Sequence, residues 1–234
     1  MSVPLLTAAT YNVHQWVGMD SFYDPFRGLK VLKELAADVI GLQEVNFPKH
    51  IKHKITPSIL AEELDMQLVV GKTLMRKEAF YGNVLLTNLP IQNVRRHDIS
   101  VGSNEPRAVL DVDLQAETGL IRVLNTHFGL RFMERRRQHQ RLLEILEEID
   151  QRETTILMGD FNEWLPLCFP FRKIMSIFKC LHAPRSFPTY FPLLALDRIL
   201  VAPAQSMIEI HVHKSRLAKI TSDHYPVVAT IKCS

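Results

Sequence analysis

Ten short apolar runs punctuate the chain, and they restrict its fold more than any other feature of the sequence. Each run has the length and the content of β-branched and aromatic residues that are typical of a strand. Several alternate apolar with polar residues, as LDVDLQ and IEIHVH do, which is typical of antiparallel sheets with one face on a core. The expected strands are LLTAATYNV (5–13), ADVIGLQEV (37–45), MQLVVGK (66–72), NVLLTN (83–88), AVLDVDLQ (108–115), LIRVLNTHF (120–128), TTILMGDFN (154–162), LDRILVAP (196–203), IEIHVH (208–213) and YPVVATIK (225–232).

Two amphipathic helices accompany these strands. In the first, Asp24 is an N-cap candidate and Pro25 takes the first helical position. Its apolar positions recur at three- and four-residue steps: Phe26, Leu29, Leu32, Leu35, Ala36 and Val39. The second helix spans roughly residues 134–151, and its apolar stripe is Leu142, Leu143, Leu146 and Ile149. Many strands with few helices predict an α/β (α+β) sandwich of two mainly antiparallel sheets, whose outer faces the helices cover.

Composition places this fold in an ordinary globular domain. With 234 residues, 47% of them hydrophobic, the chain can bury a core of normal size, and no linker or repeat interrupts it, so we expect one domain over residues 1–234. The net charge of +3 is compatible with phosphate-bearing substrates but is far below that of a protein that coats nucleic acid.

The cysteines and the absence of a long apolar segment predict the cellular compartment. Three cysteines without C-x-x-C spacing, Cys168, Cys180 and Cys233, argue against a disulfide framework and a structural zinc site. No signal peptide and no transmembrane segment is recognisable. We expect a cytoplasmic protein, with peripheral attachment to a membrane as the alternative.

The stretch TTILMGDFNEW (154–164) places polar residues directly after a buried strand. Gly159 lets the chain leave the strand with little steric restriction, and Asp160 and Asn162 then follow at its exit. Strand exits are where α/β proteins often place ligand-binding groups, although an ordinary polar turn uses the same residue types.

The same arrangement recurs along the chain. Carboxylates, amides and imidazoles stand at the ends of apolar runs in six segments: Asn12, Glu44, Asn125 with His127, Asp160 with Asn162, Asp197, and Asp223 with His224. Each of these has a structural explanation when taken alone, such as a cap, a turn or a satisfied core histidine. Together they predict that the strand ends converge on one site.

The six motifs resemble those of one known superfamily. TYNVH, LQEV, LNTH, GDFN, LDRI and SDHYPV occur in the order found in the endonuclease/exonuclease/phosphatase superfamily, from residue 10 to residue 228. This superfamily includes pancreatic-type deoxyribonucleases, abasic-site endonucleases, sphingomyelinases and inositol polyphosphate phosphatases. The chain resembles its small bacterial members, and the resemblance implies a four-layer α/β/β/α sandwich of two mixed, mainly antiparallel sheets.

The resemblance also implies a metal site. Glu44 is the expected principal ligand, assisted by Asn12 and Asp223, and this oxygen shell suits Mg²⁺ or Mn²⁺. The implied reaction is the hydrolysis of a phosphate ester by in-line attack of water.

Catalytic roles follow for the remaining motif residues. His224 is expected to act on the phosphate or the attacking water, with Asp197 holding its imidazole. Asp160, with Asn162 beside it, is expected to orient or deprotonate water, and the general base is either Asp160 or His224. His127 is expected to contact a phosphate oxygen or to protonate the leaving group.

Two further residues are candidates for substrate binding. Asn83 in YGNVLLTN matches a family segment whose amide can lie near the phosphate, and Arg107 in EPRAVL offers a bidentate fork to an anion. The alternatives are a turn residue and a surface charge. The basic segment RRRQHQR (135–141) suggests a phosphate backbone as partner, but it also fits the solvated face of a helix.

The substrate is the least determined property. The loops between the motifs carry no evident basic insertion, so we expect a small or lipid-linked phosphoester in preference to nucleic acid. In residues 165–195, the apolar positions Phe171, Ile174, Met175 and Phe178 fit either core packing or an acyl chain or membrane surface. A nuclease with the same chemistry is the first alternative, and a non-catalytic binding module is the second.

Overall fold

Two sheets packed face to face form the centre of the molecule. The computed structural model describes residues 4–48, 54–76, 79–147, 154–164, 169–178 and 183–233. In the six-stranded sheet the order is β10-β11-β1-β2-β4-β3, and in the five-stranded sheet it is β5-β6-β7-β8-β9. The strands of the first are β1 (Leu5–Asn12), β2 (Val39–Phe47), β3 (Gln67–Arg76), β4 (Ala79–Thr87), β10 (Met207–Val212) and β11 (Val227–Lys232). Those of the second are β5 (Ile91–Asp98), β6 (Ala108–Ala116), β7 (Gly119–His127), β8 (Thr154–Asp160) and β9 (Asp197–Ala202).

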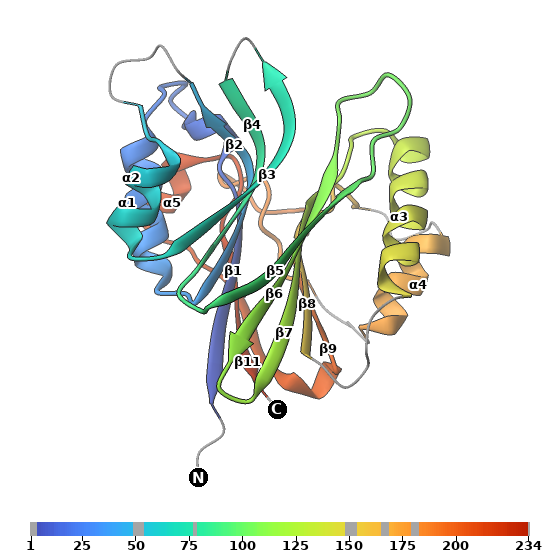
Figure 1. Cartoon of the computed structure of the whole chain (residues 1–234). Helices are drawn as coiled ribbons and strands as arrows, with labels where there is room; N and C mark the ends of the chain where they lie inside the picture. Colours follow the sequence, from blue (N-terminus) through green and yellow to red (C-terminus); the bar gives the residue numbers. More distant parts are fainter. Residues whose placement is uncertain are drawn as a thin grey trace.

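Helices cover the outer face of each sheet (Figure 1). On the six-stranded sheet lie α1 (Pro25–Leu35), α2 (Pro57–Leu64) and α5 (Arg216–Thr221), and on the five-stranded sheet lie α3 (Phe132–Leu146) and α4 (Phe169–Ile177). Two short turns of 3-10 helix, η1 (His14–Trp16) and η2 (Ala204–Ser206), complete the described elements. The expected four-layer α/β/β/α sandwich is thereby confirmed.

The three interfaces between these layers hold three buried apolar clusters. One lies between the sheets and contains Leu110, Met158 and Ala229 among others. The other two lie between each sheet and its helices, with Leu32 in the one and Leu142 in the other. The central strands of each sheet are therefore buried on both faces, which explains why many of the strands read as apolar runs.

The first helix is shorter than the sequence predicts. The side chain of Asp24 caps it by accepting a hydrogen bond from the backbone N–H of Arg27 at 2.9 Å. The helix ends at Leu35 because Ala36 adopts a left-handed conformation with φ 45°. Val39, which continues the apolar periodicity, already belongs to β2.

One strand was missed by the sequence prediction. β5 (IQNVRRHD) lies at the edge of its sheet, pairs only with β6, and leaves four of its eight residues exposed. An edge strand needs no continuous apolar face, and its charged residues protect it from pairing with other chains.

The apolar stripe of the segment 165–195 packs into the core. Phe171, Ile174 and Phe178 are buried against α3 and the five-stranded sheet, as the core-packing interpretation predicts. Within the described residues, no helix is long and apolar enough to cross a membrane. Cys233 is free and buried, whereas Cys168 and Cys180 lie outside the described residues.

The topology brings the two parallel strand pairs to one edge of the sandwich. β1 and β2 run parallel in one sheet, and β7 and β8 run parallel in the other. Asn12 ends β1, and its side-chain amide donates to Asp160 Oδ2 at the end of β8, at 3.1 Å. The carboxyl ends of strands from both sheets therefore meet at this edge.

Candidate active site

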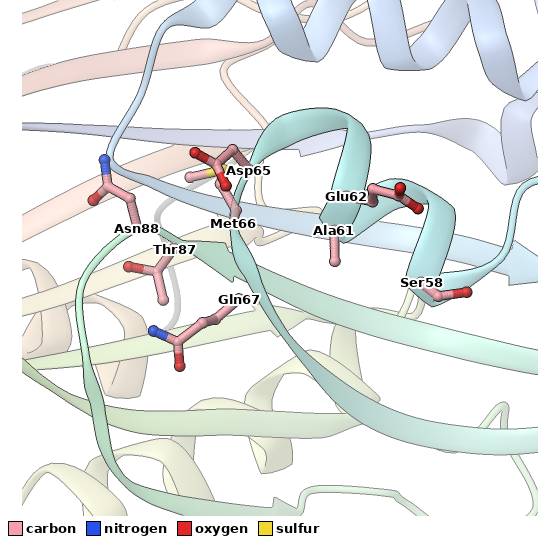
Figure 2. Close-up of a pocket in the computed structure, with 8 residues that line it drawn as sticks. All are labelled: Ser58, Ala61, Glu62, Asp65, Met66, Gln67, Thr87 and Asn88. Carbon is pink, nitrogen blue, oxygen red and sulfur yellow. The ribbon is translucent and has the colours of Figure 1, made fainter.

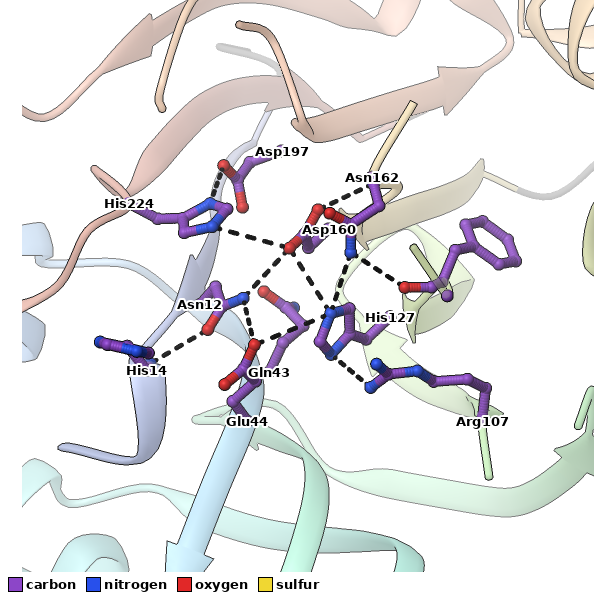
Figure 3. A network of polar contacts seen from close by, with 12 residues as sticks. Asn12, His14, Gln43, Glu44, Arg107, His127, Asp160, Asn162, Asp197 and His224 are labelled. Atoms are coloured by element: carbon purple, nitrogen blue, oxygen red, sulfur yellow. Dashed lines mark hydrogen bonds and ion pairs between the residues drawn. The ribbon is translucent and has the colours of Figure 1, made fainter. Parts of the chain in front are cut away.

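A cavity of about 420 Å³ opens where these strand ends meet. Seven of the ten residues predicted from the sequence line it: Glu44, Arg107, His127, Asp160, Asn162, Asp223 and His224. Asn12 and Asp197 stand directly behind this lining, hydrogen-bonded to Glu44 and His224 respectively. Figure 3 labels eight of the ten residues; Asn83 and Asp223 are not labelled there, and Asp223 lines the cavity.

His127 and Asp160 are neighbours because β7 and β8 end together in register. Gly159 makes this close approach possible, since a Cβ at that position would lie 1.9 Å from the carbonyl oxygen of Thr126. Its φ of 143° also favours glycine. The glycine of GDFN is thus needed to bring His127 beside Asp160.

A bulge in β2 turns Glu44 into the cavity. The pairing of β2 with β4 shifts register between Leu42 and Val45, and Glu44 has a φ of 55°. Such an irregularity re-aims one side chain relative to its neighbours. Gln43 instead stays in the core, where its amide nitrogen donates to Asn125 Oδ1 at 2.7 Å across the two sheets.

Asn12 holds the two carboxylates together. Its amide nitrogen lies 3.1 Å from Glu44 Oε1 and 3.1 Å from Asp160 Oδ2. Its amide oxygen accepts the backbone N–H of His14 at 3.0 Å. Asn12 therefore orients Glu44 and Asp160 in this arrangement (Figure 3).

Asp160 lies between two imidazoles. Its Oδ2 is 3.6 Å from His127 Nε2 and 3.8 Å from His224 Nε2, and its Oδ1 accepts the backbone N–H of Asn162 at 2.9 Å. Asn162 has a φ of 47°, a conformation that is uncommon outside glycine and recurs at functional sites. Its amide nitrogen also donates to the carbonyl of Phe128 at 2.9 Å, which fixes it against the wall of the cavity.

His224 is paired with Asp197. Its Nδ1 lies 2.8 Å from Asp197 Oδ2, and the hydroxyl of Ser186 donates to the same oxygen. The ring of Phe187 packs against the imidazole, with centroids 4.7 Å apart. The imidazole is thus fixed on one side and directs Nε2 toward Asp160.

Burial and charge shift the titration of these groups. Burial, offset in part by His224, raises the pKa of Asp160 to about 6. Burial alone would lower the pKa of His224, but Asp197 and Asp160 outweigh it and raise that pKa to about 10. For His127, burial together with the positive charges of Arg107 and His224 holds the pKa well below its ordinary value. At neutral pH these values describe an ionised Asp160 between a neutral imidazole and a protonated one.

The lining fits a hard divalent cation. Glu44 and Asp223 present carboxylates to the cavity, and the nearest described basic groups are both 3.9 Å away, His127 Nε2 from Glu44 and His14 Nδ1 from Asp223. Carboxylates without a close cationic partner are the donors that such an ion requires. The ligand atoms of Asp160, Asp197 and His224 also lie within 4.8 Å of one another, so these three side chains form a second group of potential ligands.

Asn83 lies apart from this group. It is buried in β4, and its amide donates to the carbonyl of Ala108 at 3.1 Å, so it joins the two sheets and does not line the cavity. A second cavity, of about 740 Å³, lies beside α2 and the adjacent ends of β3 and β4 (Figure 2). None of the predicted site residues lines it.

Several residues at the site were not anticipated from the sequence. Ser186 bonds to Asp197, and Ser222 bonds through its hydroxyl to the carbonyl of Asn12 at 2.7 Å. Ser222 stands in the motif SDHYPV, so its position was a usable signal, whereas nothing in the sequence around Ser186 marks it. Tyr81 and Trp164 also line the cavity. Each stands two residues from a predicted site residue, Asn83 and Asn162 respectively, so their positions were a usable signal.

Two mixed sheets are packed between helices, and a histidine-aspartate pair and a cluster of carboxylates lie at one edge. The protein is therefore an α/β sandwich with a polar site at its strand ends. A model of the endonuclease/exonuclease/phosphatase family matches residues 28–224. The chain belongs to this family, as the resemblance of its motifs predicts. Members of the family are generally hydrolytic phosphoesterases or nucleases that depend on a divalent metal ion.

Relatives and solved structures agree with this assignment. The uncharacterized protein YbhP of Escherichia coli (strain K12) is 31% identical over 245 residues, covering 95% of this chain and 94% of YbhP. An endonuclease/exonuclease/phosphatase from Beutenbergia cavernae has a TM-score of 0.79 at 20% identity, over 98% of this chain and 72% of that one. D. rerio TDP2, complexed with a single strand DNA product, has a TM-score of 0.69 at 16% identity, over 97% of this chain and 98% of its own. The likeness to these two structures shows the fold.

Proposed function

We propose that this protein hydrolyses small phosphodiesters with Mg²⁺ or Mn²⁺ as cofactor. The observation that carries the proposal is Asp160, an ionisable carboxylate placed between the Nε2 atoms of His127 and His224, at 3.6 and 3.8 Å. A carboxylate with a pKa raised to about 6 is mostly ionised at neutral pH and is still basic enough to accept a proton from water.

The residues divide the reaction between them. Water attacks phosphorus in line with the ester oxygen of the leaving group, and one proton of the water passes to Asp160 Oδ2. The bond from phosphorus to the leaving oxygen breaks with its electron pair passing to that oxygen, and the oxyanion that departs takes a proton from solvent. His224, protonated and held by Asp197, donates from Nε2 to a phosphoryl oxygen and stabilises the charge that builds there. This assigns the base to Asp160 among the two candidates.

The metal site proposed for this reaction consists of Glu44 and Asp223, with Asn12 orienting Glu44. A divalent ion bound there supplies charge neutralisation at the phosphate and activates water for attack. Asn12 was expected to act as a ligand, and in the structure its amide oxygen is engaged by His14.

The walls of the cavity favour a small ester. Leu130, Phe187 and Leu194 contribute apolar surface to a cavity of about 420 Å³, which suits the organic part of a small ester. The apolar stripe of α4 is buried, so it gives no support to a lipid-linked substrate.

A nuclease remains the second candidate. The observation that favours it is the likeness over 97% of the chain to D. rerio TDP2, whose structure is complexed with a single strand DNA product.

A substrate panel tests the proposal. The purified protein with Mg²⁺ is incubated with chromogenic phosphodiesters, phosphomonoesters, phospholipids, nicked DNA and abasic DNA, and Asp160→Asn serves as the matched control. We expect hydrolysis of small diesters by the wild type that exceeds the Asp160→Asn control by about a hundredfold or more. Activity that is equal in the two proteins contradicts the mechanism, and turnover that is fastest on DNA promotes the second candidate.

A further inference from the structure

Arg107 was expected to bind substrate, but its guanidinium is already engaged. Its NH1 lies 2.9 Å from His127 Nδ1 and 2.9 Å from Glu105 Oε1. The contact with Glu105 is an ion pair, whereas NH1 makes its hydrogen bond to His127. The side chain of Arg107 is only 10% exposed and that of His127 only 4%, so the hydrogen bond between them is shielded from water.

The contact between Arg107 and His127 determines which ring nitrogen carries the proton. A guanidinium donates hydrogen bonds and cannot accept them, so His127 Nδ1 must be the acceptor and must be unprotonated. A neutral imidazole with an unprotonated Nδ1 carries its hydrogen on Nε2. Arg107 therefore selects the Nε2–H tautomer of His127.

The selected tautomer turns a donor toward the reacting group. His127 Nε2 lies 3.2 Å from the amide nitrogen of Asn162, which is also a donor, so these two groups cannot satisfy each other. The nearest acceptors, Asp160 Oδ2 at 3.6 Å and Glu44 Oε1 at 3.9 Å, are beyond normal hydrogen-bond distance. Two N–H donors thus lie side by side in the lining of the cavity (Figure 3). An acceptor bound in the cavity can take a hydrogen bond from both, and a phosphoryl oxygen has the required chemistry.

We propose that Arg107 is a positioning residue that locks His127 as a hydrogen-bond donor to a non-bridging phosphoryl oxygen, and that His127 does not protonate the leaving group. The proposal rests on the proposed phosphodiesterase function. It decides between the two roles that the sequence left open for His127. Loss of the Nε2 proton from a neutral imidazole would leave an imidazolate beside two carboxylates, which is electrostatically prohibitive.

The alternative for Arg107 is direct contact with the phosphate. A double-mutant cycle separates the two, using Arg107→Met, His127→Ala and the combined variant, with bis-para-nitrophenyl phosphate as substrate and Mg²⁺ present. If Arg107 acts through His127, then Arg107→Met lowers kcat/KM by about tenfold in the wild-type background and has no further effect in His127→Ala. If the two losses multiply, Arg107 acts by itself and the proposal is overturned. Arg107→Lys keeps a hydrogen-bond donor and should recover part of the lost kcat/KM. Arg96→Met is the control variant, because Arg96 is exposed on β5 and does not line the cavity.

The role of His127 is tested with two leaving groups. A nitrophenolate departs without a proton, whereas a phenolate is more basic and gains from one. We expect His127→Ala to lower kcat/KM about a hundredfold to a thousandfold, by the same factor for bis-para-nitrophenyl phosphate and diphenyl phosphate. His127→Gln keeps an N–H donor near the position of Nε2 and should lose less than His127→Ala on both. A loss confined to diphenyl phosphate identifies a proton donor and refutes the proposal.

A measurement independent of activity completes the test. Heteronuclear NMR of the histidine ring nitrogens distinguishes protonated from unprotonated nitrogen, and the signals of His127 are assigned by their disappearance in His127→Gln. We expect the metal-free protein at neutral pH to show Nε2 protonated and Nδ1 unprotonated. A protonated Nδ1 overturns the inference even if the protein is an active phosphodiesterase. If the protein shows the expected tautomer but has no such activity, the positioning of His127 by Arg107 stands and the proposed function is refuted.

Discussion

Asp197 and His224 belong to different sheets, yet Asp197 Oδ2 lies 2.8 Å from His224 Nδ1. Asp197 begins β9 in the five-stranded sheet, and His224 stands just before β11 in the six-stranded sheet. The pair can form only when the two sheets are packed together, so the site depends directly on the integrity of the sandwich.

This pair gives the first prediction. His224→Ala should lower kcat by about a hundredfold to ten-thousandfold with little loss of stability, because its imidazole acts on the transition state. Asp197→Asn should do less damage, because the amide oxygen can still accept the N–H of Nδ1 while the orienting charge is lost. Steady-state kinetics and thermal unfolding of both variants check this. A His224→Ala protein as active and as stable as the wild type would remove His224 from the mechanism.

The second prediction is dependence on a divalent ion. Glu44 and Asp223 offer hard oxygen donors, so a chelator should abolish hydrolysis and added Mg²⁺ or Mn²⁺ should restore it. Titration calorimetry should show binding of Mn²⁺ to the wild type and weaker binding to Glu44→Gln, whose amide keeps the shape but not the charge. Full activity in excess chelator contradicts the metal site.

The third prediction concerns the close approach at Gly159. Gly159 and Gly119 have nearly the same φ, 143° and 142°, but a Cβ at Gly159 meets the carbonyl of Thr126 at 1.9 Å and one at Gly119 meets nothing within 4 Å. Gly119→Ala should therefore lower the free energy of unfolding only by backbone strain, about 1–2 kcal/mol. Gly159→Ala should cost about 1–3 kcal/mol more and displace Asp160 from His127. Urea unfolding compares them, and equal losses would show that the strands do not approach so closely.

The fourth prediction is a loss of stability in acid that depends on His139. This histidine lies on the buried face of α3, between Phe128 and Phe171. Burial, followed by the positive charges of Arg135 and Arg198, lowers its pKa from 6.5 to about 3. At pH values between about 3 and 6.5, the unfolded chain therefore binds a proton at His139 that the folded protein does not bind. Stability from this group is complete above pH 6.5 and falls as the pH drops toward 3.

The variant His139→Leu isolates this contribution. Between pH 7 and pH 5 the wild type should lose about 2 kcal/mol more free energy of unfolding than His139→Leu does. Urea unfolding of both proteins at the two pH values measures the difference. His211→Leu, which removes an exposed histidine, is the control and should follow the wild type. Parallel losses in wild type and His139→Leu would contradict the burial argument.

The fold was largely predictable because periodicity and burial agree in most strands. Ten of the eleven described strands appear as apolar runs, because at least one face of each packs against the core. β5 was not predicted from the sequence, because an exposed edge strand carries no such apolar run. The end of α1 was also misplaced, because the left-handed conformation of Ala36 depends on how the chain turns into β2.

The site was predictable by its residues and not by its geometry. Motif residues at strand ends identify eight groups that meet, but which atoms face each other depends on the strand register and the backbone conformation. The bulge that turns Glu44 inward and the pairing of Arg107 with His127 both arise from contacts between segments far apart in the sequence. Sequence patterns are local, so they could not show that Arg107 contacts His127 or that Asn83 lies outside the lining of the cavity.

The basic segment RRRQHQR bears on the choice of substrate. Arg135, its first residue, is buried and bonds to Glu163, and its guanidinium lies 4.6 Å from the ring centre of Trp164. It is therefore not available to a phosphate backbone. Arg136 and Arg137 are exposed, which leaves a small positive surface for DNA on this helix.

The fifth prediction is a preference for small phosphodiesters over duplex DNA, with a shallow dependence on salt. The chain carries a net charge of only +3, and Arg135 of the basic segment is paired with Glu163. A surface that neutralised several phosphates would release counterions and weaken steeply as salt rises, whereas a site for one phosphate group would not. Rates on small diesters and on plasmid and abasic DNA, measured from low to physiological salt, separate these cases. Efficient DNA cleavage at catalytic protein concentrations, with affinity falling steeply over that range of salt, would establish a nuclease in place of an enzyme for small esters. The protein would then contact several phosphates of a nucleic-acid backbone and not a single ester.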